Sequence, residues 1–238
     1  MKTDITPKTA EENFEADLLR LRRCVGVLGL LLPTLMLGLH QKLLASMSHY
    51  YYTSSSIFFT GILFAFGLVL MAYRGYQKDS DERFSDDQLT SLAGLFALIT
   101  VIIPTSCYDS GDTSIVCKDG YLLGHCSMGL NTLHLIAAGL FIIILGWMCI
   151  YKFTRSTKEE SMKKHRLYKI CGFTIWAAVG TIGLLIAIEK IFKIKVDDYL
   201  FGYVFILEAV ALYAFAVAWL VKGKIDRDIK QLKTKWFG

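Results

Sequence analysis

Ionisable side chains inside apolar stretches are the residues of this sequence best placed to do chemistry. His134 lies in the apolar block 132–153, and Glu208 lies in the apolar block 199–221. An ionisable group in the core of a bilayer costs several kcal/mol unless it is paired or hydrated, so such residues often mark functional sites. An imidazole and a carboxylate can serve there as acid and base or as hydrogen-bonding partners of a ligand. His134 and Glu208 are therefore the leading site candidates.

Further polar residues lie at the same ends of the apolar blocks, which the charge distribution below assigns to the outer side. These candidates for a ligand pocket are His40, Ser48, His49, Asp109 and Glu189. A polar pocket that opens outward between the first, fourth, fifth and sixth blocks would satisfy them together. Plainer interpretations remain open, because solvation at the interface explains His40 and Glu189, and a bond to a neighbouring helix explains His134. The inner half of the bundle is expected to be nearly free of ionisable groups.

Known catalytic and metal-binding patterns are mostly absent from the sequence. There is no HExxH, no GxSxG, no phosphate-binding loop and no HxxxH within an apolar block. A Ser–His pair can be drawn from Ser46 or Ser48 with His134, but the pairing alone identifies no nucleophile and none is assigned. No metal site and no cofactor are expected, and zinc near His125 and Cys126 is kept as the alternative.

The candidate residues are carried by apolar blocks of a length that can cross a membrane. A transmembrane helix needs about 20 apolar residues, and six blocks meet or approach that length: 24–45, 56–73, 89–106, 132–153, 170–191 and 199–221. Hydrophobic residues make up 54% of the 238-residue chain, above the about 45–50% of soluble domains. The sequence therefore predicts an all-α integral membrane protein, a bundle of six transmembrane helices.

Lysine and arginine are distributed unevenly among the segments between these blocks. With a cytoplasmic N-terminus, 21 of the 26 lie in inner segments and five in outer segments. The positive-inside rule then predicts that both termini are cytoplasmic. The net charge of +5 is thus a signal of topology and of contact with anionic lipid, not of nucleic-acid binding. Membrane lipid is the expected partner, with assembly into a homo-oligomer or a larger membrane complex left open.

Two polar segments flank the predicted bundle, which spans residues 24–222. Segment 1–23 carries a capping box from Thr9 to Glu12 and predicts a short cytoplasmic helix before the first span. Segment 223–238 has apolar residues at helical spacing on a basic background. It predicts a cytoplasmic amphipathic helix on the membrane surface, or else a continuation of the sixth span.

The outer loop 107–131 is the longest connection and holds half of the six cysteines, namely Cys107, Cys117 and Cys126. Disulfides persist on the outer side of a membrane, so one pair is expected to bond. The sequence does not choose among the three pairings. The remaining cysteines are expected to pack as small apolar side chains.

Several motifs together resemble a family of uncharacterised bacterial six-span membrane proteins. They cover most of residues 20–223 and comprise Ser46–Thr53, Tyr73–Tyr76, Phe96–Ala97, Pro104–Thr105, Leu133–His134 followed by Ala137, Ala138 and Phe141, Leu207–Glu208, and Trp219–Gly223. The resemblance implies a bacterial cytoplasmic (inner) membrane and carries no assigned activity. The serine-rich entry to the second block and His134 also resemble, more distantly, the DRAM/FRAG-type six-span proteins, some of which are linked to lipid handling.

Four residues also resemble part of the metal-binding set of the ceramidase/progestin-receptor superfamily, a group of zinc-dependent lipid amidases. These are the three histidines at 40, 49 and 134 and the serine at 48. The resemblance implies zinc and amide hydrolysis. The superfamily's paired histidines on the last span are absent, however, and Glu208 occupies that span here, which argues against both.

These observations favour a non-catalytic membrane protein that binds a lipid or a small amphipathic ligand in an outward-facing polar pocket. One alternative is a membrane-embedded lipid hydrolase, metal-dependent or not, in which His134 and Glu208 act as acid and base or as metal ligands. A second alternative is a small proton-coupled transporter in which Glu208 carries the proton.

Overall fold

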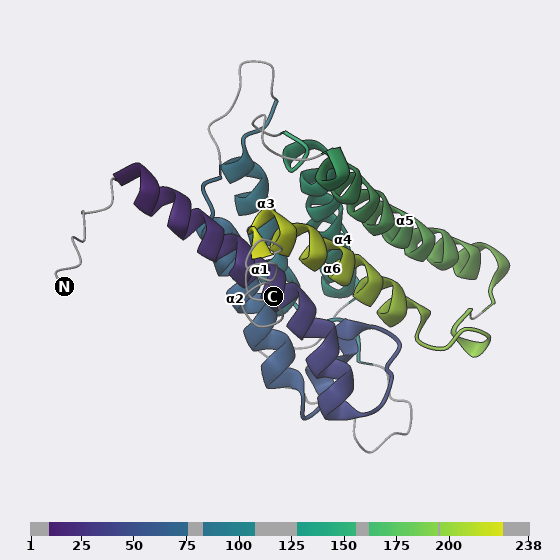
Figure 1. Ribbon diagram of the computed structural model, residues 1–238. Helices are drawn as coiled ribbons and strands as arrows, with labels where there is room; N and C mark the ends of the chain where they lie inside the picture. The colour runs from purple at the N-terminus through teal and green to yellow at the C-terminus, as the bar shows by residue number, and fades with distance from the viewer. Residues whose placement is uncertain (1–9, 76–82, 108–127, 156–161, 195, 226–238) are drawn as a thin grey trace, which may run out of the picture.

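The computed structural model describes residues 10–75, 83–107, 128–155, 162–194 and 196–225. These ranges form six α-helices and no strand. Three short turns accompany the helices: the 3₁₀ turn η1 (Met47–Tyr52) follows the first helix, the π-helical turn η2 (Met148–Lys152) continues the fourth, and the 3₁₀ turn η3 (Val196–Asp198) precedes the sixth. The α-helices, shown in Figure 1, are α1 Ala10–His40, α2 Ser56–Ala72, α3 Asp86–Ile102, α4 Met128–Trp147, α5 Met162–Phe192 and α6 Tyr203–Lys222. The predicted all-helical fold is confirmed for these residues.

The six helices pack as one ring. Each helix contacts its neighbours in sequence, and α6 closes the ring against α1. Gly26 of α1 lies beside Leu220 of α6, and Gly29 lies beside Ala216, so these two helices run antiparallel. The interior is aromatic: Phe66 of α2 meets Phe141 of α4 and Phe215 of α6 with ring centroids 5.5 and 5.7 Å apart.

Glycines bring neighbouring helices close together. A Cβ atom added to Gly94 of α3 would lie 2.5 Å from the carbonyl oxygen of Gly67 in α2. A Cβ atom added to Gly172 of α5 would lie 2.9 Å from the carbonyl oxygen of Gly146 in α4. Small residues at such crossings are typical of helix packing inside membranes, where van der Waals contact replaces hydrophobic burial as the driving force.

Two glycines of α4 provide a matched test of this packing. A Cβ atom at Gly146 would lie 2.5 Å from the ring of Trp176, which is held by a 3.1 Å hydrogen bond to Ile143, whereas one at Gly139 would meet no atom within 4 Å. We expect Gly146→Ala to lower the free energy of unfolding by about 1–3 kcal/mol through overpacking. Gly139→Ala should be neutral or stabilising by up to about 1 kcal/mol through helix propensity. Thermal unfolding in detergent measures both, and equal melting temperatures would contradict the α4–α5 contact.

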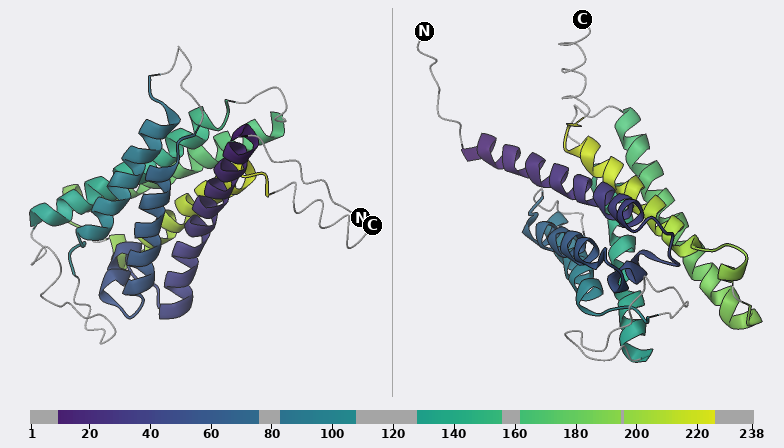
Figure 2. Two further views of the ribbon diagram at one scale, coloured as in Figure 1. Left: turned by 90° about the vertical axis from the view of Figure 1, so that its left-hand side faces the viewer. Right: turned by 90° about the horizontal axis from the view of Figure 1, so that it is seen from below.

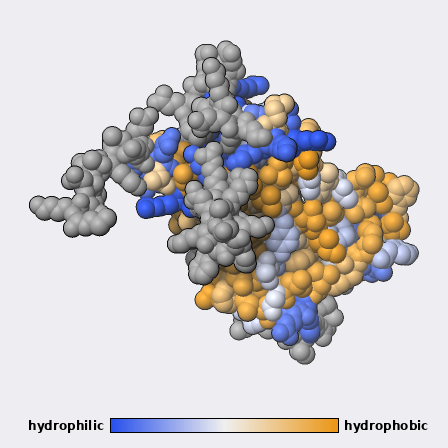
Figure 3. All heavy atoms as spheres, viewed as in Figure 1, coloured by the Kyte–Doolittle hydropathy of each residue, from blue (hydrophilic) through white to orange (hydrophobic). Residues whose placement is uncertain are grey.

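Four helical stretches are long and apolar enough to cross a membrane: Asn13–His40, Gly129–Lys152, Met162–Phe192 and Tyr203–Lys222. The shorter helix α2, of 17 residues, is also apolar. Large apolar side chains stand exposed along these helices, and Figure 3 shows apolar residues covering the side formed by α5 and α6 between polar ends. The chain is therefore a helical membrane protein with at least these candidate spans.

The helices differ from the predicted blocks mainly around α1 and α5. Residues 24–40 of the block 24–45 belong to a helix that begins at Ala10 and ends at His40, so no break separates residues 10–23 of the predicted tail from the first span, and residues 41–45 lie beyond the helix. Gln41 follows with a φ of 58°, in the left-handed region, which ends the helix. Helix α5 begins at Met162 rather than near residue 170, because its basic first turns are helical although they are not apolar.

Candidate functional site

The short turn η1 lies between helices at one end of the ring and is held there by buried side chains. Ser48 Oγ lies 2.8 Å from His134 Nε2, and His134 Nδ1 lies 2.6 Å from the carbonyl oxygen of Ile103, which follows α3. His134 is only 1% exposed. Because a carbonyl can only accept, Nδ1 donates to Ile103, and in the neutral imidazole Nε2 accepts from the Ser48 hydroxyl. His134 thus joins η1 to α4 and to the end of α3.

Glu208 contacts Met47, the residue that precedes Ser48 in η1. The backbone N–H of Met47 donates to Glu208 Oε2 at 2.8 Å. The consecutive residues Met47 and Ser48 therefore bring Glu208 of α6 and His134 of α4 to one place. Within the described part of the chain, the second carboxylate oxygen, Oε1, makes no hydrogen bond, and the half-buried Glu208 side chain retains some solvent access.

Two further contacts fix η1 over this end of the ring. The backbone N–H of Phe205 in α6 donates to the carbonyl oxygen of Ala45 at 3.1 Å. The hydroxyl of Tyr52 donates to the carbonyl oxygen of Thr105 in the segment after α3. The turn is thus tied to α6, to α4 and to the connection between α3 and α4.

His49 lies beside the same cluster. Its Nδ1 is 2.9 Å from Ser46 Oγ. Burial lowers the pKa of His49 below its usual value, the carboxylate of Asp197 in η3 opposes that shift, and His134 adds a smaller lowering. His49 therefore favours the neutral form in this environment more than a solvated histidine does.

Two of the other predicted pocket residues serve local structure. Glu189 Oε1 accepts from the backbone N–H of Val196 at 2.8 Å and so caps η3 rather than joining His134. The ring of His40 packs edge-on against Tyr50, with centroids 5.4 Å apart. Asp109 lies outside the described residues.

The predicted metal and disulfide sites fall mostly in the loop that the structure does not describe. Cys117, Cys126 and His125 lie there, and Cys107 is the last described residue before it, so the predicted disulfide stays a prediction. Cys24, Cys149 and Cys171 are free thiols. In the described ranges, no three His, Cys, Asp or Glu side chains are grouped so that they could hold a metal ion.

One prediction about aromatic residues is wrong. Tyr and Trp near the ends of apolar blocks are typical of the interfacial belts of a membrane protein, which predicts such a position for Tyr50, Tyr52 and Trp219. The structure buries them at 0%, 5% and 0% exposure. Trp219 contacts Tyr73 and Phe153 with ring centroids 5.1 and 5.2 Å away, so it belongs to the core. Trp147, at 40% exposure, keeps a position suited to an interface.

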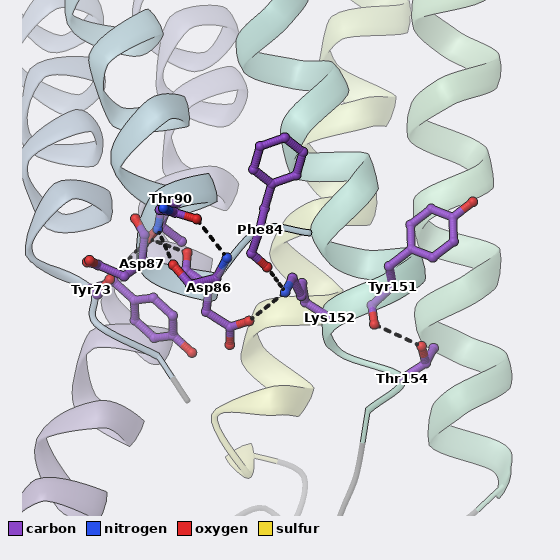
Figure 4. A network of polar contacts seen from close by, with 10 residues as sticks. Tyr73, Phe84, Asp86, Asp87, Thr90, Tyr151, Lys152 and Thr154 are labelled. Carbon is purple, nitrogen blue, oxygen red and sulfur yellow. Dashed lines mark hydrogen bonds and ion pairs between the residues drawn. The ribbon is translucent and has the colours of Figure 1, made fainter. Parts of the chain in front are cut away.

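The expectation that the inner half carries few ionisable groups is also wrong, since the opposite end of the ring buries four charged residues: Arg22, Asp86, Lys152 and Lys222. Lys152 Nζ donates to the carbonyl oxygen of Phe84 and lies 3.6 Å from Asp86 Oδ1, as Figure 4 shows. Lys222 Nζ donates to the carbonyl oxygen of Phe153 at 3.2 Å. We call this the basic end of the bundle.

The basic end joins helices that are distant in sequence. Arg22 Nε of α1 donates to the hydroxyl of Tyr73 after α2 at 3.0 Å, and Arg23 Nε donates to the carbonyl oxygen of Gly223 after α6 at 2.9 Å. Helix α3 starts with a capping box between Ser85 and Gln88. That box is the sequence signal that could have extended the third predicted block back to Asp86.

Comparison with known proteins finds no match for this chain. No family model matches the chain, and no curated protein and no solved structure matches it. A function for this chain is therefore inferred from its own residues and contacts.

Proposed function

We propose that this chain is a six-span membrane protein that binds the polar head group of an amphiphile, with Glu208 as the main polar contact and η1 as the segment that shapes the site. Helices α2 and α3 pack in the same ring as the four longer apolar helices, which supports six spans. The excess of lysine and arginine at the basic end supports a cytoplasmic position for that end and for both termini. The site then faces outward, and the family resemblance supports a bacterial inner membrane.

The observation that carries the proposal is the Glu208 carboxylate. One of its oxygens accepts from Met47 N–H, and the other has no hydrogen-bond partner in the described ranges. A carboxylate among apolar helices needs donors for both oxygens, because burial without them is costly. A ligand hydroxyl, amide or ammonium group would supply the missing donor. An ammonium group would also neutralise the charge.

The outer half of α5 supports a route for the acyl chain. Helices α4 and α5 touch at Gly146 and Gly172, toward the basic end. Beyond Ala178, no described residue of α5 is buried, and Figure 2 shows α4 diverging there from the pair formed by α5 and α6. Leu184 of α5 and Ile136 of α4 are 61% and 54% exposed. These apolar surfaces suit an acyl chain whose head group lies near Glu208.

Lipid retention tests this proposal. We expect the purified protein from vesicles of phosphatidylethanolamine and phosphatidylglycerol to retain phosphatidylethanolamine in native mass spectrometry. Glu208→Gln keeps an acceptor for Met47 N–H but removes the charge, and should reduce retention by about tenfold, which corresponds to about 1.4 kcal/mol. Glu189→Gln, at a carboxylate that caps η3, is the control and should leave retention unchanged. Equal retention in both variants would contradict a head-group site at Glu208.

A second candidate function is a lipid hydrolase with Ser48 as nucleophile. The specific observation is the 2.8 Å contact between Ser48 Oγ and His134 Nε2, with Nδ1 oriented by the Ile103 carbonyl. This is the arrangement in which an imidazole acts as general base toward a serine hydroxyl. A fluorophosphonate probe separates the candidates. Labelling that Ser48→Ala abolishes and Ser46→Ala preserves would favour the hydrolase.

A further inference from the structure

A groove of about 710 Å³ lies at the basic end, along the first turns of α5. One part of its lining is basic and comprises Lys163, His165, Arg166 and Lys169, while Ile170 and Phe173 line it on the apolar side. The two apolar side chains are 55% and 57% exposed. The groove therefore spans the change from the basic turns of α5 to its membrane-exposed apolar stretch.

Two of the cations that line this groove have no acidic partner among the described residues. Arg166 and Lys169 are exposed and make no ion pair with any described residue. The Nε2 atom of His165 is shielded from solvent and has no hydrogen-bond partner in the described ranges. An anion in the groove would meet two cationic side chains, and His165 offers it a further polar group.

We propose that this groove binds the phosphate of an anionic phospholipid from the leaflet at the basic end. Arginine and lysine bind phosphate oxygens through charge-assisted hydrogen bonds. Basic pockets between membrane helices on the cytoplasmic side suit anionic head groups. Ile170 and Phe173 lie next to these cations and would contact the first segment of the acyl chains, which a free phosphate lacks. The site is separate from Glu208, at the other end of the bundle, and does not depend on the function proposed there.

Helix α5 supplies its own matched control. Arg166→Gln with Lys169→Gln removes two of the three exposed cations that line the groove, and Lys190→Gln with Lys193→Gln removes two exposed cations at the other end of the same segment. Neither pair contributes to the buried core, so both variants should fold. In native mass spectrometry after reconstitution with phosphatidylglycerol and phosphatidylcholine, the first double variant should retain about tenfold less phosphatidylglycerol. The second should match the unchanged protein.

Three outcomes would overturn the inference. Equal loss in both double variants would show a general charge effect, and no loss in either would show that the groove does not bind this lipid. Displacement of phosphatidylglycerol by inorganic phosphate at the same concentration would show that the acyl chains contribute nothing. Higher salt should weaken retention at this partly exposed site, because screening reduces the attraction.

Discussion

Lys152→Met is expected to lower the free energy of unfolding by about 3–5 kcal/mol, because it leaves a buried carboxylate without its cation. Lys152 Nζ lies 3.6 Å from Asp86 Oδ1, and the two side chains are 4% and 7% exposed. The same substitution also removes the donor to the Phe84 carbonyl. Denaturant unfolding in detergent micelles measures the change.

An exposed ion pair provides the control. Arg20 NH1 lies 3.3 Å from Asp17 Oδ1, but the side chains are 80% and 69% exposed. Arg20→Met should therefore change stability by no more than about 1 kcal/mol. Adding Asp86→Asn to Lys152→Met should recover part of the loss, since the buried charge is then gone. Simple additivity of the two substitutions would contradict a direct Lys152–Asp86 interaction.

His134→Phe is expected to lower the free energy of unfolding by about 2–5 kcal/mol. Phenylalanine keeps the ring but leaves the Ser48 hydroxyl and the Ile103 carbonyl without their partner in a buried place, and each orphaned group costs about 1–3 kcal/mol. The loss should release η1, so proteolysis near residues 41–55 should become faster. His165→Phe is the matched control, because the imidazole of His165 has no hydrogen-bond partner at Nε2 in the described ranges. Similar stability of the two variants would contradict the role of His134 in holding η1.

Hydropathy correctly predicted helices at whose ends the sequence changes sharply from polar to apolar residues. The block 56–73 corresponds to α2, Ser56–Ala72, because polar residues stand before it and the apolar run is uninterrupted. Hydropathy did not predict the start of α1, although the capping box at residues 9–12 predicted that a helix begins there. Residues 10–23 are polar yet contain no helix breaker, so the helix continues through a change of composition that resembles a boundary.

The sequence predicted the two leading residues of the candidate site but not how they are arranged. His134 and Glu208 stand out because ionisable groups are rare in apolar blocks. Their partner is η1, whose conformation depends on Gln41 and on long-range hydrogen bonds that no local pattern reveals. This turn occupies much of the place predicted for an open pocket. Both ring nitrogens of His134 have hydrogen-bond partners there, whereas one oxygen of Glu208 has no protein partner in the described ranges.

The basic end was missed for a different physical reason. Lys152 and Lys222 are the last residues of η2 and α6, and a cation at the end of an apolar run resembles a solvated loop residue. Their partners, Phe84, Asp86 and Phe153, come from other elements of the fold. Aromatic residues mislead similarly, because Tyr and Trp suit both a core and an interface.

An electron cryomicroscopy map of the full chain in nanodiscs that contain phosphatidylethanolamine tests the central claim most directly. The proposal predicts elongated non-protein density between η1 and α6, with its polar end about 3 Å from Glu208 Oε1, at hydrogen-bonding distance. Glu208→Gln should weaken that density while η1 keeps its position. A well-resolved map in which Oε1 bonds only to protein or to water, with no elongated density beside it, would contradict the account.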